Sequence, residues 1–476
     1  MNTRTLAWIA QATGGQLHDA DAQQCVDAVA IDSRDLPKGR LAMFVALRGE
    51  NFDGHEHVAA ALAGGCVAAL VSRRVEADLP QILVADTERA LAAIASDMQR
   101  ERASAHGTKL LAITGSNGKT SVKTMLLSIL DRCGLAYASP GNRNNEIGLP
   151  LAVIAAPDAA DFAIYEMGAG KPGDIAYLAD IVQPDVALVN NIAAAHLERL
   201  GTLLGVADTK AAIYDALPTD GTAVINADDA FAPYFVERAD GRRVVRFGLD
   251  STAEIHARDV QLDGDATRFV LVAPAGDIAI TLSMPGRHNL SNALAAASMA
   301  FAVGANLEQI RDGLDAVQPV AGRMVSHRMS SGVLLIDDSY NANPGSLAAA
   351  IESLATSTWT QDGEESWLVL GDMRELGADA RAMHLQAGQH AKAAGITQLY
   401  ALGPLSAAAA EGFGEGSQHF VSHGDLAASL IARLGTGPDV GTRVLVKGSR
   451  GSAMERIVSA LLQHDALSTK GDRDAA

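Results

Sequence analysis

One stretch of the chain combines the residue types that bind phosphate groups. The apolar run 109–113 is followed by the turn 114–118, Thr-Gly-Ser-Asn-Gly, and then by Lys119 and Thr120. Glycines let backbone N–H groups converge on phosphate oxygens, Lys119 can reach the outer phosphates, and the Thr120 hydroxyl can bind Mg²⁺. Ile113 stands where the usual G-x-x-x-x-G-K-[ST] pattern has its first glycine, so this is a shorter variant. Because a predicted strand precedes the turn and a predicted helix follows it, we favour a nucleotide site over a solvent-exposed glycine turn.

Two more candidate groups follow predicted strands. The strand 162–165 ends at Glu166, and the strand 185–192 is followed by His196. In open α/β sheets, ligands bind beyond the carboxyl ends of the strands, so we expect these side chains and Lys119 at one sheet edge. This arrangement predicts a triphosphate and metal site in which Glu166 and His196 are candidate Mg²⁺ ligands. Histidine is an unusual Mg²⁺ ligand, so Glu166 is the stronger candidate.

Three polar loops are further candidates for ligand binding. Ser33 and Arg34 follow a predicted strand, and an arginine there can make paired contacts to a phosphate, although a plain turn explains them equally well. The loop 48–55 also carries charged and polar groups. The loop 139–150 contains three asparagines, one arginine and two glycines, and this density of amides favours a binding loop over an ordinary connection.

A literal G-x-G-x-x-G occurs at 168–173, after a predicted strand. The next strand ends in Asn190 and Asn191 rather than in the acidic residue that would bind a ribose hydroxyl. The end of the motif also leaves room for only a short helix, 175–181. A dinucleotide-binding fold is therefore not favoured.

The elements that would position these groups form three segments. Residues 1–86 read as a small mixed unit, residues 87–318 as a connecting helix followed by a parallel α/β sheet, and residues 319–476 as a second doubly wound unit. The polar end, 464–476, is expected to fray. We therefore expect an α/β fold of three domains: a small mixed α/β N-terminal domain, a central P-loop domain with a parallel sheet, and a C-terminal Rossmann-like domain.

Composition narrows the class of partner. The formal net charge of −18, from 38 basic and 56 acidic residues, argues against a general nucleic-acid or membrane-surface binder. Cys25, Cys66 and Cys133 are far apart and form no C-x-x-C, which disfavours disulfides and zinc and fits a reducing compartment. The apolar stretch 6–10 is too short for a signal segment, and no run approaches ~20 apolar residues. We expect a soluble cytoplasmic protein, without nucleic-acid or membrane partners.

A series of short motifs runs in order from residue 32 to residue 450 and resembles the bacterial Mur ligase family. The series comprises 32–34 (Asp-Ser-Arg), 46–49, 53–55, 114–120, 141–148 (Gly-Asn-Arg-Asn-Asn-Glu-Ile-Gly), 165–168, 191–198, 285–289, 322–323, 337–344 (Asp-Asp-Ser-Tyr-Asn-Ala-Asn-Pro), 371–373 and 447–450. Within the family, the blocks 141–148 and 337–344 resemble the members that add D-Ala-D-Ala. The short phosphate loop is the usual form in this family, which accounts for the missing first glycine.

The resemblance implies a division of labour and a reaction. The first domain would bind the uridine diphosphate part of UDP-MurNAc-tripeptide, the central one would bind ATP, and the last would close over the site. ATP would activate a peptide carboxylate as an acyl phosphate, which the amine of D-Ala-D-Ala would attack, giving UDP-MurNAc-pentapeptide for peptidoglycan synthesis. Because carboxylate and triphosphate repel each other, Lys119 and two Mg²⁺ ions are expected to neutralise them. A monomer is expected.

The residues and the resemblance together assign roles by position. The expected catalytic residues are Lys119, Glu166, His196 and Lys210, and the expected metal ligands are Thr120, Glu166 and His196. The expected ATP-binding residues are Thr114, Gly115, Ser116, Asn117, Gly118, Lys119, Thr120, Ser121, Asn289, Asn292, Arg323 and Asp338. The expected substrate-binding residues are Ser33, Arg34, Arg48, Asp53, His55, Asn142, Asn144, Asn145, Tyr340, Asn343 and Lys447.

Lys210 has two interpretations. It lies in a predicted helix, 202–217, where a lysine commonly extends along the surface to water. The resemblance instead implies that Lys210 is carried as a carbamate, whose negative charge could bridge to Mg²⁺. The surrounding Ala-Asp-Thr-Lys-Ala-Ala-Ile departs from the many relatives that have a second lysine before this position and Gly-Glu after it.

Two alternatives remain open. One is another ligase of the same architecture, which adds diaminopimelate or lysine, or a folylpolyglutamate synthase; the block 337–344 disfavours both. The other is a P-loop ATPase without an amine acceptor, which offers no reason for a third α/β domain with a polar edge of its own.

Overall fold

The structure is a computed structural model that describes the chain except residues 195–196, 250–252, 264–265, 357–364, 435–440 and 475–476. Its strands form a two-stranded sheet and four larger sheets, each of which lies within one of the three predicted segments. The observed α/β class and its several largely parallel sheets confirm the predicted fold class. The boundaries 1–86, 87–318 and 319–476 remain predictions.

The first segment is built on a five-stranded sheet in the order β2-β7-β6-β5-β4. Its strands are β2 (Gln16–His18), β4 (Ala28–Ala30), β5 (Ala42–Val45), β6 (Ala68–Val71) and β7 (Gln81–Leu83), of which only β2 is antiparallel to its neighbour. The other elements are α1 (Leu6–Thr13), η1 (Gly54–His57), α2 (Val58–Ala63) and the short pair β1 (Arg4–Thr5) and β3 (Cys25–Val26). The segment is therefore the small mixed unit that the sequence predicts.

The connecting helix at the start of the second predicted segment is α3 (Thr87–His106). The side chain of Asp86, rather than that of Thr87, caps it by accepting hydrogen bonds from two backbone N–H groups of the first turn. The Thr87 hydroxyl instead donates to the Ala46 carbonyl at 2.9 Å. Apolar residues of α3 belong to one hydrophobic core with residues of both the first segment and the central sheet. The helix is thus a packed junction between the two.

The central sheet has six parallel strands in the order β13-β12-β11-β8-β10-β9. They are β8 (Lys109–Thr114), β9 (Ala136–Ala138), β10 (Phe162–Glu166), β11 (Val186–Val189), β12 (Thr222–Asn226) and β13 (Arg243–Phe247). The helices around it are α4 (Lys119–Leu130), α5 (Gly148–Ala155), α6 (Asp174–Val182), α7 (Leu197–Leu200), α8 (Leu203–Asp215), α9 (Ala232–Arg238), α10 (Arg287–Ala302) and α11 (Leu307–Ala316).

The central strand β8 contributes side chains to the hydrophobic cores on both faces of the sheet. Successive side chains of a strand point to opposite faces. Accordingly, Leu110 and Ala112 join the core formed with α3, α5, α6 and α8, whereas Leu111 and Ile113 join the core formed with α4, α10 and α11. Burial on both faces explains why β8 reads as a continuous apolar run, and it fixes where the turn after the strand must emerge.

The region 256–282 departs from the predicted parallel sheet. It forms a separate antiparallel sheet of β14 (His256–Asp263), β15 (Ala266–Ala273) and β16 (Gly276–Leu282). Phe269, Leu271, Ile280 and Leu282 extend the core around α4, α10 and α11. Apolar and polar residues alternate along these strands, as is typical of an antiparallel sheet with one buried face. The strands and helices on either side in the sequence favoured a parallel sheet instead.

The third segment holds a six-stranded sheet in the order β17-β18-β22-β19-β20-β21, in which only β17 is antiparallel. Its strands are β17 (Val325–Arg328), β18 (Leu334–Asp338), β19 (Ser366–Gly371), β20 (Gln398–Leu402), β21 (Ser417–Phe420) and β22 (Arg443–Lys447). The helices are α12 (Pro344–Thr356), η2 (Gly377–Asp379), α13 (Ala380–Ala393), α14 (Ala407–Phe413), α15 (His423–Leu434), η3 (Arg450–Ser452) and α16 (Glu455–Asp474), and two cores lie on the two faces of the sheet.

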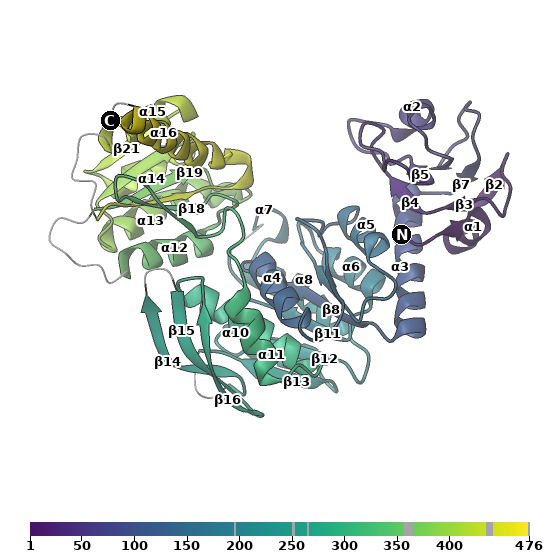
Figure 1. Ribbon diagram of the computed structural model, residues 1–476, viewed down its shortest axis with the longest axis horizontal. Helices are drawn as coiled ribbons and strands as arrows, with labels where there is room; N and C mark the ends of the chain where they lie inside the picture. The colour runs from purple at the N-terminus through teal and green to yellow at the C-terminus, as the bar shows by residue number, and fades with distance from the viewer. Residues whose placement is uncertain (195–196, 250–252, 264–265, 357–364, 435–440, 475–476) are drawn as a thin grey trace.

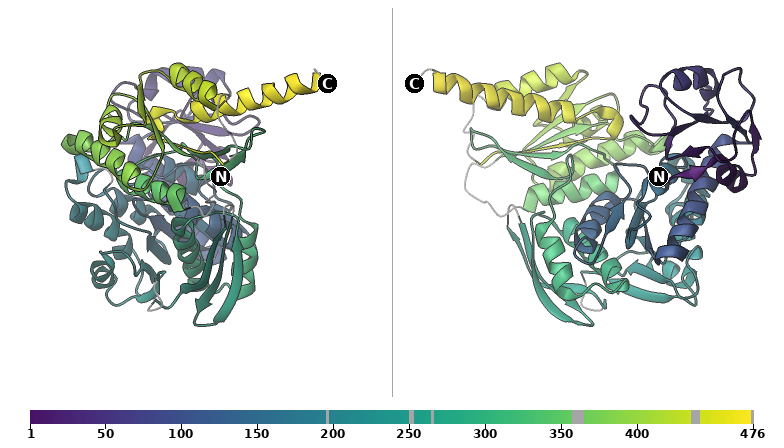
Figure 2. Two further views of the ribbon diagram at one scale, coloured as in Figure 1. Left: turned by 90° about the vertical axis from the view of Figure 1, so that its left-hand side faces the viewer. Right: turned by 45° about the vertical axis from the view of Figure 1, so that its right-hand side comes forward.

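The end of the chain corrects a prediction. The segment 464–476 was expected to fray, whereas α16 continues to Asp474 and projects from the body of the third segment (Figure 2).

The three segments lie in a row with the central one in the middle. Figure 1 and the right-hand view of Figure 2 show the first and third segments at opposite ends of the molecule, each seated on the central segment. None of the described helices has the length and apolarity needed to cross a membrane.

Candidate active site

The phosphate loop lies between β8 and α4, as the sequence predicts. Gly118 precedes α4 with a φ of 79°, and no described side chain caps the helix. The backbone N–H groups of the first turn are therefore available to an anion. A Cβ at Gly118 would lie 2.3 Å from Oδ1 of Asn292, so only glycine fits there. Gly115 and Thr114 form the base of the loop, where the Thr114 hydroxyl donates to the Met167 carbonyl at 2.9 Å.

Lys119 lies folded over the loop. Its ammonium donates to the Gly115 carbonyl at 2.7 Å, a geometry that encloses the space in front of the loop amides. Burial lowers the pKa of Lys119, with a further lowering from Arg323, while the carboxylate of Glu166 opposes the shift. The ammonium is thus held in a poorly solvated position, where a phosphate would stabilise its charge.

Two asparagines that follow β11 hold the phosphate loop in place. Asn191 accepts from the backbone N–H of Asn117 at 2.8 Å, and its own carbonyl accepts from that of Ser116 at 2.9 Å. Asn190 donates from Nδ2 both to the Asn117 carbonyl at 3.0 Å and to Oδ1 of Asn292 at 2.9 Å. This pair was noted in the sequence only as an argument against a dinucleotide site, and it is a supporting feature of the loop that the prediction missed.

The carboxylate of Glu166 lies next to the start of α4. One oxygen accepts from the Thr120 hydroxyl at 2.9 Å, and the other accepts from Nδ2 of Asn144 at 2.9 Å. Lys123, which was not predicted, forms an ion pair with Glu166 at 3.1 Å. Burial alone would raise the pKa of Glu166, but Lys123, Lys119 and the donated hydrogen bonds outweigh it and lower that pKa. The buried side chain is therefore an anion beside a hydroxyl, which suits a divalent cation.

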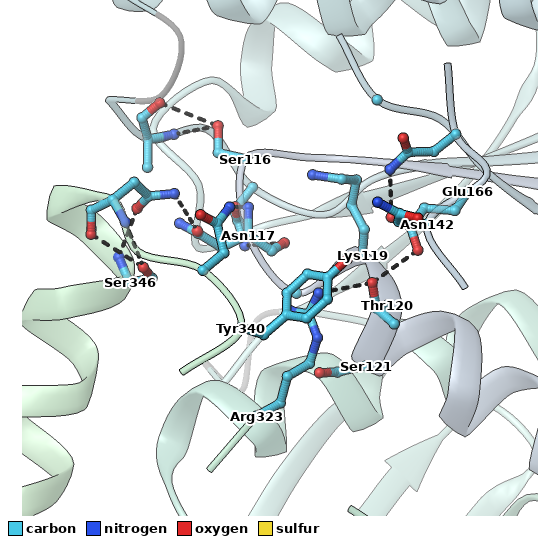
Figure 3. Close-up of a pocket in the computed structure, with 18 of the residues that line it drawn as sticks. Ser116, Asn117, Lys119, Thr120, Ser121, Asn142, Glu166, Arg323, Tyr340 and Ser346 are labelled. Atoms are coloured by element: carbon cyan, nitrogen blue, oxygen red, sulfur yellow. Dashed lines mark hydrogen bonds between the residues drawn. The ribbon is translucent and has the colours of Figure 1, made fainter. Parts of the chain in front are cut away.

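Residues of the third segment complete the site from the opposite side (Figure 3). Nη2 of Arg323 donates to the Thr120 hydroxyl at 3.0 Å, and its guanidinium lies 4.4 Å from the ring centre of Tyr340. Asn343 donates to the side-chain oxygen of Asn117 at 2.7 Å. Two contacts to the phosphate loop therefore join the third segment to the central one.

A buried ion pair lies at the end of the third sheet. Nζ of Lys447 contacts a carboxylate oxygen of Asp338 at 2.5 Å and donates to the Asn341 carbonyl at 3.0 Å. Asp338 ends β18 and Lys447 ends β22, which are parallel neighbours, so the two side chains meet at the same edge.

Lys210 is one of the most buried lysines, with 1% of its surface exposed. No described residue forms a hydrogen bond or an ion pair with its amine. Burial lowers its pKa well below the ordinary value, and the charge of Lys119 lowers it further. The structure therefore excludes the surface interpretation and places the amine where its neutral form is favoured over its charged form.

These groups surround one cavity of about 720 Å³ between the central and third segments. The predicted site residues that line it are Ser116, Asn117, Gly118, Lys119, Thr120, Ser121, Asn142, Asn144, Asn145, Glu166, Lys210, Asn289, Asn292, Arg323, Asp338, Tyr340, Asn343 and Lys447. His288, Glu198, Arg199 and Arg450 also line it and were not predicted.

Asn289 and Asn292, two of the expected ATP-binding residues, lie in the first two turns of α10, which begins at Arg287. Asn289 donates to the Pro285 carbonyl at 2.9 Å, and Asn292 faces the phosphate loop through Asn190. Neither caps the helix, which leaves their cavity-facing atoms for a ligand.

The predicted residues of the first segment lie apart from this cavity. Arg34 is paired with Asp32 at 2.7 Å, Arg48 is exposed, and Ser33 is half-buried. His55 is buried, and its ring bonds Asp53 at 2.5 Å and accepts from the Ser72 backbone at 2.9 Å. Both ring nitrogens are occupied by bonds that fix the surrounding loop, and the assignment of His55 to substrate binding remains a prediction.

His196, one of the predicted metal ligands, lies outside the described residues. Among those that are described, no group of three or more His, Cys, Asp or Glu side chains could hold a metal ion. Mg²⁺ commonly binds one or two carboxylates and takes its other ligands from water and substrate phosphates. The adjacent oxygens of Glu166 and Thr120, which face the space before the phosphate loop, fit that pattern.

Comparison with known families matches most of the chain. Residues 113–300 match the Mur ligase middle domain, and residues 322–450 match the Mur ligase, glutamate ligase domain. Both matches cover the parts that surround the cavity.

Relatives match over nearly the full length. The UDP-N-acetylmuramoyl-tripeptide–D-alanyl-D-alanine ligase of Escherichia coli (strain K12) is 40% identical, over 97% of this chain and 98% of its own. A crystal structure of MurF from Acinetobacter baumannii is 33% identical with a TM-score of 0.90, covering 97% of this chain and 99% of the other. The MurF ligase of Thermotoga maritima in complex with ADP is 26% identical with a TM-score of 0.79, covering 91% and 97%. A folylpolyglutamate synthase of Mycobacterium tuberculosis, at 21% identity with a TM-score of 0.63, covering 78% of this chain and 93% of the other, shares the fold alone.

Proposed function

The chain belongs to the Mur ligase family, and we propose that it is the ATP-dependent ligase that joins D-Ala-D-Ala to UDP-MurNAc-tripeptide. The observation that carries this is the full-length similarity to D-alanyl-D-alanine ligases, combined with a cavity on which the phosphate loop, Glu166 and Lys210 converge. The product is UDP-MurNAc-pentapeptide, used in peptidoglycan synthesis. A cytoplasmic monomer fits this role.

The phosphate loop supports a role in binding ATP. The free N–H groups at the start of α4 and the Lys119 ammonium face the cavity from one side, and Arg323 faces it from the other. These positive or partly positive groups around a triphosphate would lower the repulsion that an approaching carboxylate meets. Asn289, Asn292 and Asp338 line the same cavity and are the candidates for contacts to the rest of the nucleotide.

Glu166 and Thr120 are the described residues that would hold Mg²⁺. When bound, Mg²⁺ neutralises phosphate oxygens and orients the nucleotide. A second ion and a contribution from His196 belong to the same proposal. The ionised state of Glu166, which Lys123 and Lys119 favour, supplies the anionic ligand without a competing proton.

Lys210 is proposed to carry a carbamate. A neutral amine adds to CO₂ by forming an N–C bond and releasing a proton, and burial favours the neutral form of Lys210 by lowering its pKa. The amine of Lys210 is buried and has no partner among the described residues. As a carbamate, the side chain would carry a negative charge that could interact with Mg²⁺. This supports the assignment beyond the similarity of sequence.

Activation of the peptide carboxylate is proposed to proceed by transfer of the terminal phosphoryl group. A carboxylate oxygen forms a bond to phosphorus, and ADP leaves. The amine of D-Ala-D-Ala then attacks the carbonyl carbon, the amide bond forms, and phosphate departs with that oxygen. Tyr340, Asn343 and Lys447 from the third segment, and Asn142, Asn144 and Asn145 from the central one, are the proposed substrate contacts on the cavity walls.

The first segment is proposed to bind the uridine diphosphate part of the substrate through Ser33, Arg34 and Arg48. Arg34 is exposed, and its guanidinium forms an ion pair with Asp32 at the surface. A diphosphate could compete with Asp32 for this guanidinium. Asp53 and His55 support the neighbouring loop.

The test is a phosphate-release assay with ATP, Mg²⁺ and UDP-MurNAc-tripeptide, with and without D-Ala-D-Ala, combined with the mass of the product. We expect release only with the dipeptide, and a product heavier by D-Ala-D-Ala less water. Lys119→Ala should lower the rate by about 100–1000-fold, whereas Lys109→Ala, an exposed lysine on β8, should not. Release that does not depend on the dipeptide would show an ATPase instead.

A further inference from the structure

A second lysine of helix α4 lies behind the candidate metal ligand. Lys123 is one turn beyond Lys119 and has 5% of its surface exposed. Its ammonium donates to the Gly141 carbonyl at 2.7 Å and forms the ion pair with Glu166 at 3.1 Å. It is absent from the residues that line the cavity, so a ligand in the cavity would not touch it.

The donors on Glu166 divide into two groups by position. Thr120 and Asn144 line the cavity, on the side from which a cation would approach. Thr120 and Glu166 would hold a cation there, in place of the hydrogen bond that now joins them. Lys123 contacts Oε2, the carboxylate oxygen that also accepts from Thr120, but it does not line the cavity, so its ion pair can persist when a cation binds from the cavity side.

The same ammonium holds the loop 139–147. Gly141 carries the carbonyl that accepts from Lys123, and Asn144, three residues later, contacts Glu166 through its side chain. The Asn144 carbonyl also accepts from the Gly168 backbone at 2.7 Å, just beyond the end of β10. The loop is thus attached to β10 at one point and to α4 at another, with Lys123 as the link to α4.

A buried ammonium is costly unless it is paired and hydrogen-bonded. The described contacts of Lys123 meet that requirement with two groups that both belong to the site. We propose that Lys123 is a positioning residue, which fixes the carboxylate of Glu166 for Mg²⁺ and holds the asparagine loop 139–147 against the cavity. This inference rests on the proposed function, because it concerns the metal and substrate side of the same site.

Metal binding provides the first test. Residues that orient a metal ligand typically affect metal affinity by about 10–100-fold. We expect Lys123→Met to weaken Mn²⁺ binding in the presence of ATP about tenfold, measured by electron paramagnetic resonance of the free ion. Thr124→Val is the matched control: Thr124 does not line the cavity, and its hydroxyl donates only to the backbone carbonyl of Thr120 one turn earlier in α4, so the variant should bind Mn²⁺ as the wild type does.

Hydrogen exchange provides the second test and needs neither metal nor nucleotide. In the free protein, the amides of 139–147 should exchange several-fold faster in Lys123→Met than in the wild type or in Thr124→Val. Lys123→Arg, which keeps the charge, should show slower loop exchange and tighter Mn²⁺ binding than Lys123→Met. Should Lys123→Met not fold, Lys123→Gln takes its place with the same expectations.

Unchanged Mn²⁺ affinity together with unchanged exchange of the loop in the uncharged variant would overturn the proposal. Failure of the proposed function is distinguishable, because it would appear in the wild type as absence of dipeptide-dependent phosphate release. Equal effects of Lys123→Met and Thr124→Val would also overturn it, since they would show a general disturbance of α4.

Discussion

At the scale of single residues, the site is defined by how closely the phosphate loop is packed. Gly118 and Gly115 approach the asparagines that follow β11 and those on α10, leaving no space for a side chain. The same asparagines bond the loop backbone, so the amides are already oriented in the free protein. Catalysis by charge stabilisation requires such a prearranged set of donors, since little reorganisation is then needed during reaction.

A pair of glycine variants tests this packing. Gly118→Ala should lower the affinity for ATP at least about tenfold, because the new Cβ would lie 2.3 Å from Oδ1 of Asn292 and 2.5 Å from Nδ2 of Asn190. Gly107→Ala is the matched control, as Gly107 has a φ of 68° and no atom within 4 Å of an added Cβ. Both variants carry the cost of a left-handed alanine, about 1–2 kcal/mol. Binding would be measured by isothermal titration, and equal losses in the two variants would contradict the packing argument.

The sequence predicted the residues whose chemistry is visible in a local pattern. Lys119, Thr120 and Glu166 stand at strand ends or in a glycine turn, and the structure brings them together. Lys123 could not be found in this way, because its role depends on Gly141 and Glu166, which only the fold brings close. A local signal did exist, since a lysine at helical spacing from Lys119 falls on a face of α4 that is otherwise largely apolar and buried.

At the scale of elements, the packing of helix α8 determines the burial of the Lys210 amine. The helix is capped by Thr202 and buries Val206, Ala207 and Ala211 together with the lysine, so the amine is carried into the interior. Its position beside the cavity, and not its sequence neighbourhood, argues for a modified lysine.

Removal of the Lys210 side chain provides a test that separates its role from that of Lys119. Lys210→Ala should lose activity by about two to three orders of magnitude, and added short carboxylates should restore part of it by supplying the missing anion. The same carboxylates should leave Lys119→Ala inactive, since that variant lacks a cation. The measurement is the initial rate of ligation against carboxylate concentration, and a fully active Lys210→Ala would contradict the carbamate.

A histidine of helix α13, which contacts the backbone that follows β19, gives the third segment a pH dependence. The buried ring of His384 accepts from the Met373 backbone N–H at 2.9 Å through Nε2 and donates from Nδ1 to the Ala380 carbonyl at 2.7 Å. Burial lowers the pKa of His384, so the unfolded chain binds a proton more readily than the folded one. Stability is therefore complete above about pH 6.5 and falls as the pH drops below it.

This dependence can be measured by thermal unfolding between pH 7.5 and pH 5. The wild type should lose more melting temperature over that range than His384→Gln, whose side chain does not titrate. His419→Gln, a change at an exposed histidine of the same segment, should keep the wild-type dependence. Parallel curves for the wild type and His384→Gln would contradict the assignment.

The elements themselves were predictable where periodicity and flanking turns agreed, as for β8, α4 and β10. Prediction failed for 256–282, because the strands were assigned one by one and their antiparallel pairing depends on turns that carry little sequence signal. The cap of α3 could not be read from the sequence, because Asp86 and Thr87 are both good capping residues and only the hydrogen bond of Thr87 to Ala46 in the folded chain decides between them.

At the scale of the whole molecule, the proposed substrate must contact both the first segment and the cavity, which lie apart. Residues of the first segment do not line the cavity, whereas the third segment already contacts the phosphate loop through Arg323 and Asn343. A substrate that carries both a uridine diphosphate and a peptide carboxylate would have to span from the first segment to the cavity. The arrangement therefore predicts that the segments move closer together when substrates bind.

Small-angle X-ray scattering can test this movement. The radius of gyration should fall when UDP-MurNAc-tripeptide and a non-hydrolysable ATP analogue are both present, and should fall less with either one alone. Identical scattering profiles with and without both ligands would contradict closure.

The central claim is that a carboxylate of the substrate is activated by phosphoryl transfer in this cavity. The direct measurement is to label the reacting carboxylate of UDP-MurNAc-tripeptide with a heavy isotope of oxygen and to analyse the phosphate released with ATP and D-Ala-D-Ala. Activation predicts that each phosphate formed carries one labelled oxygen and that the product amide retains the other. Phosphate without label, formed alongside the ligated product, would contradict the account.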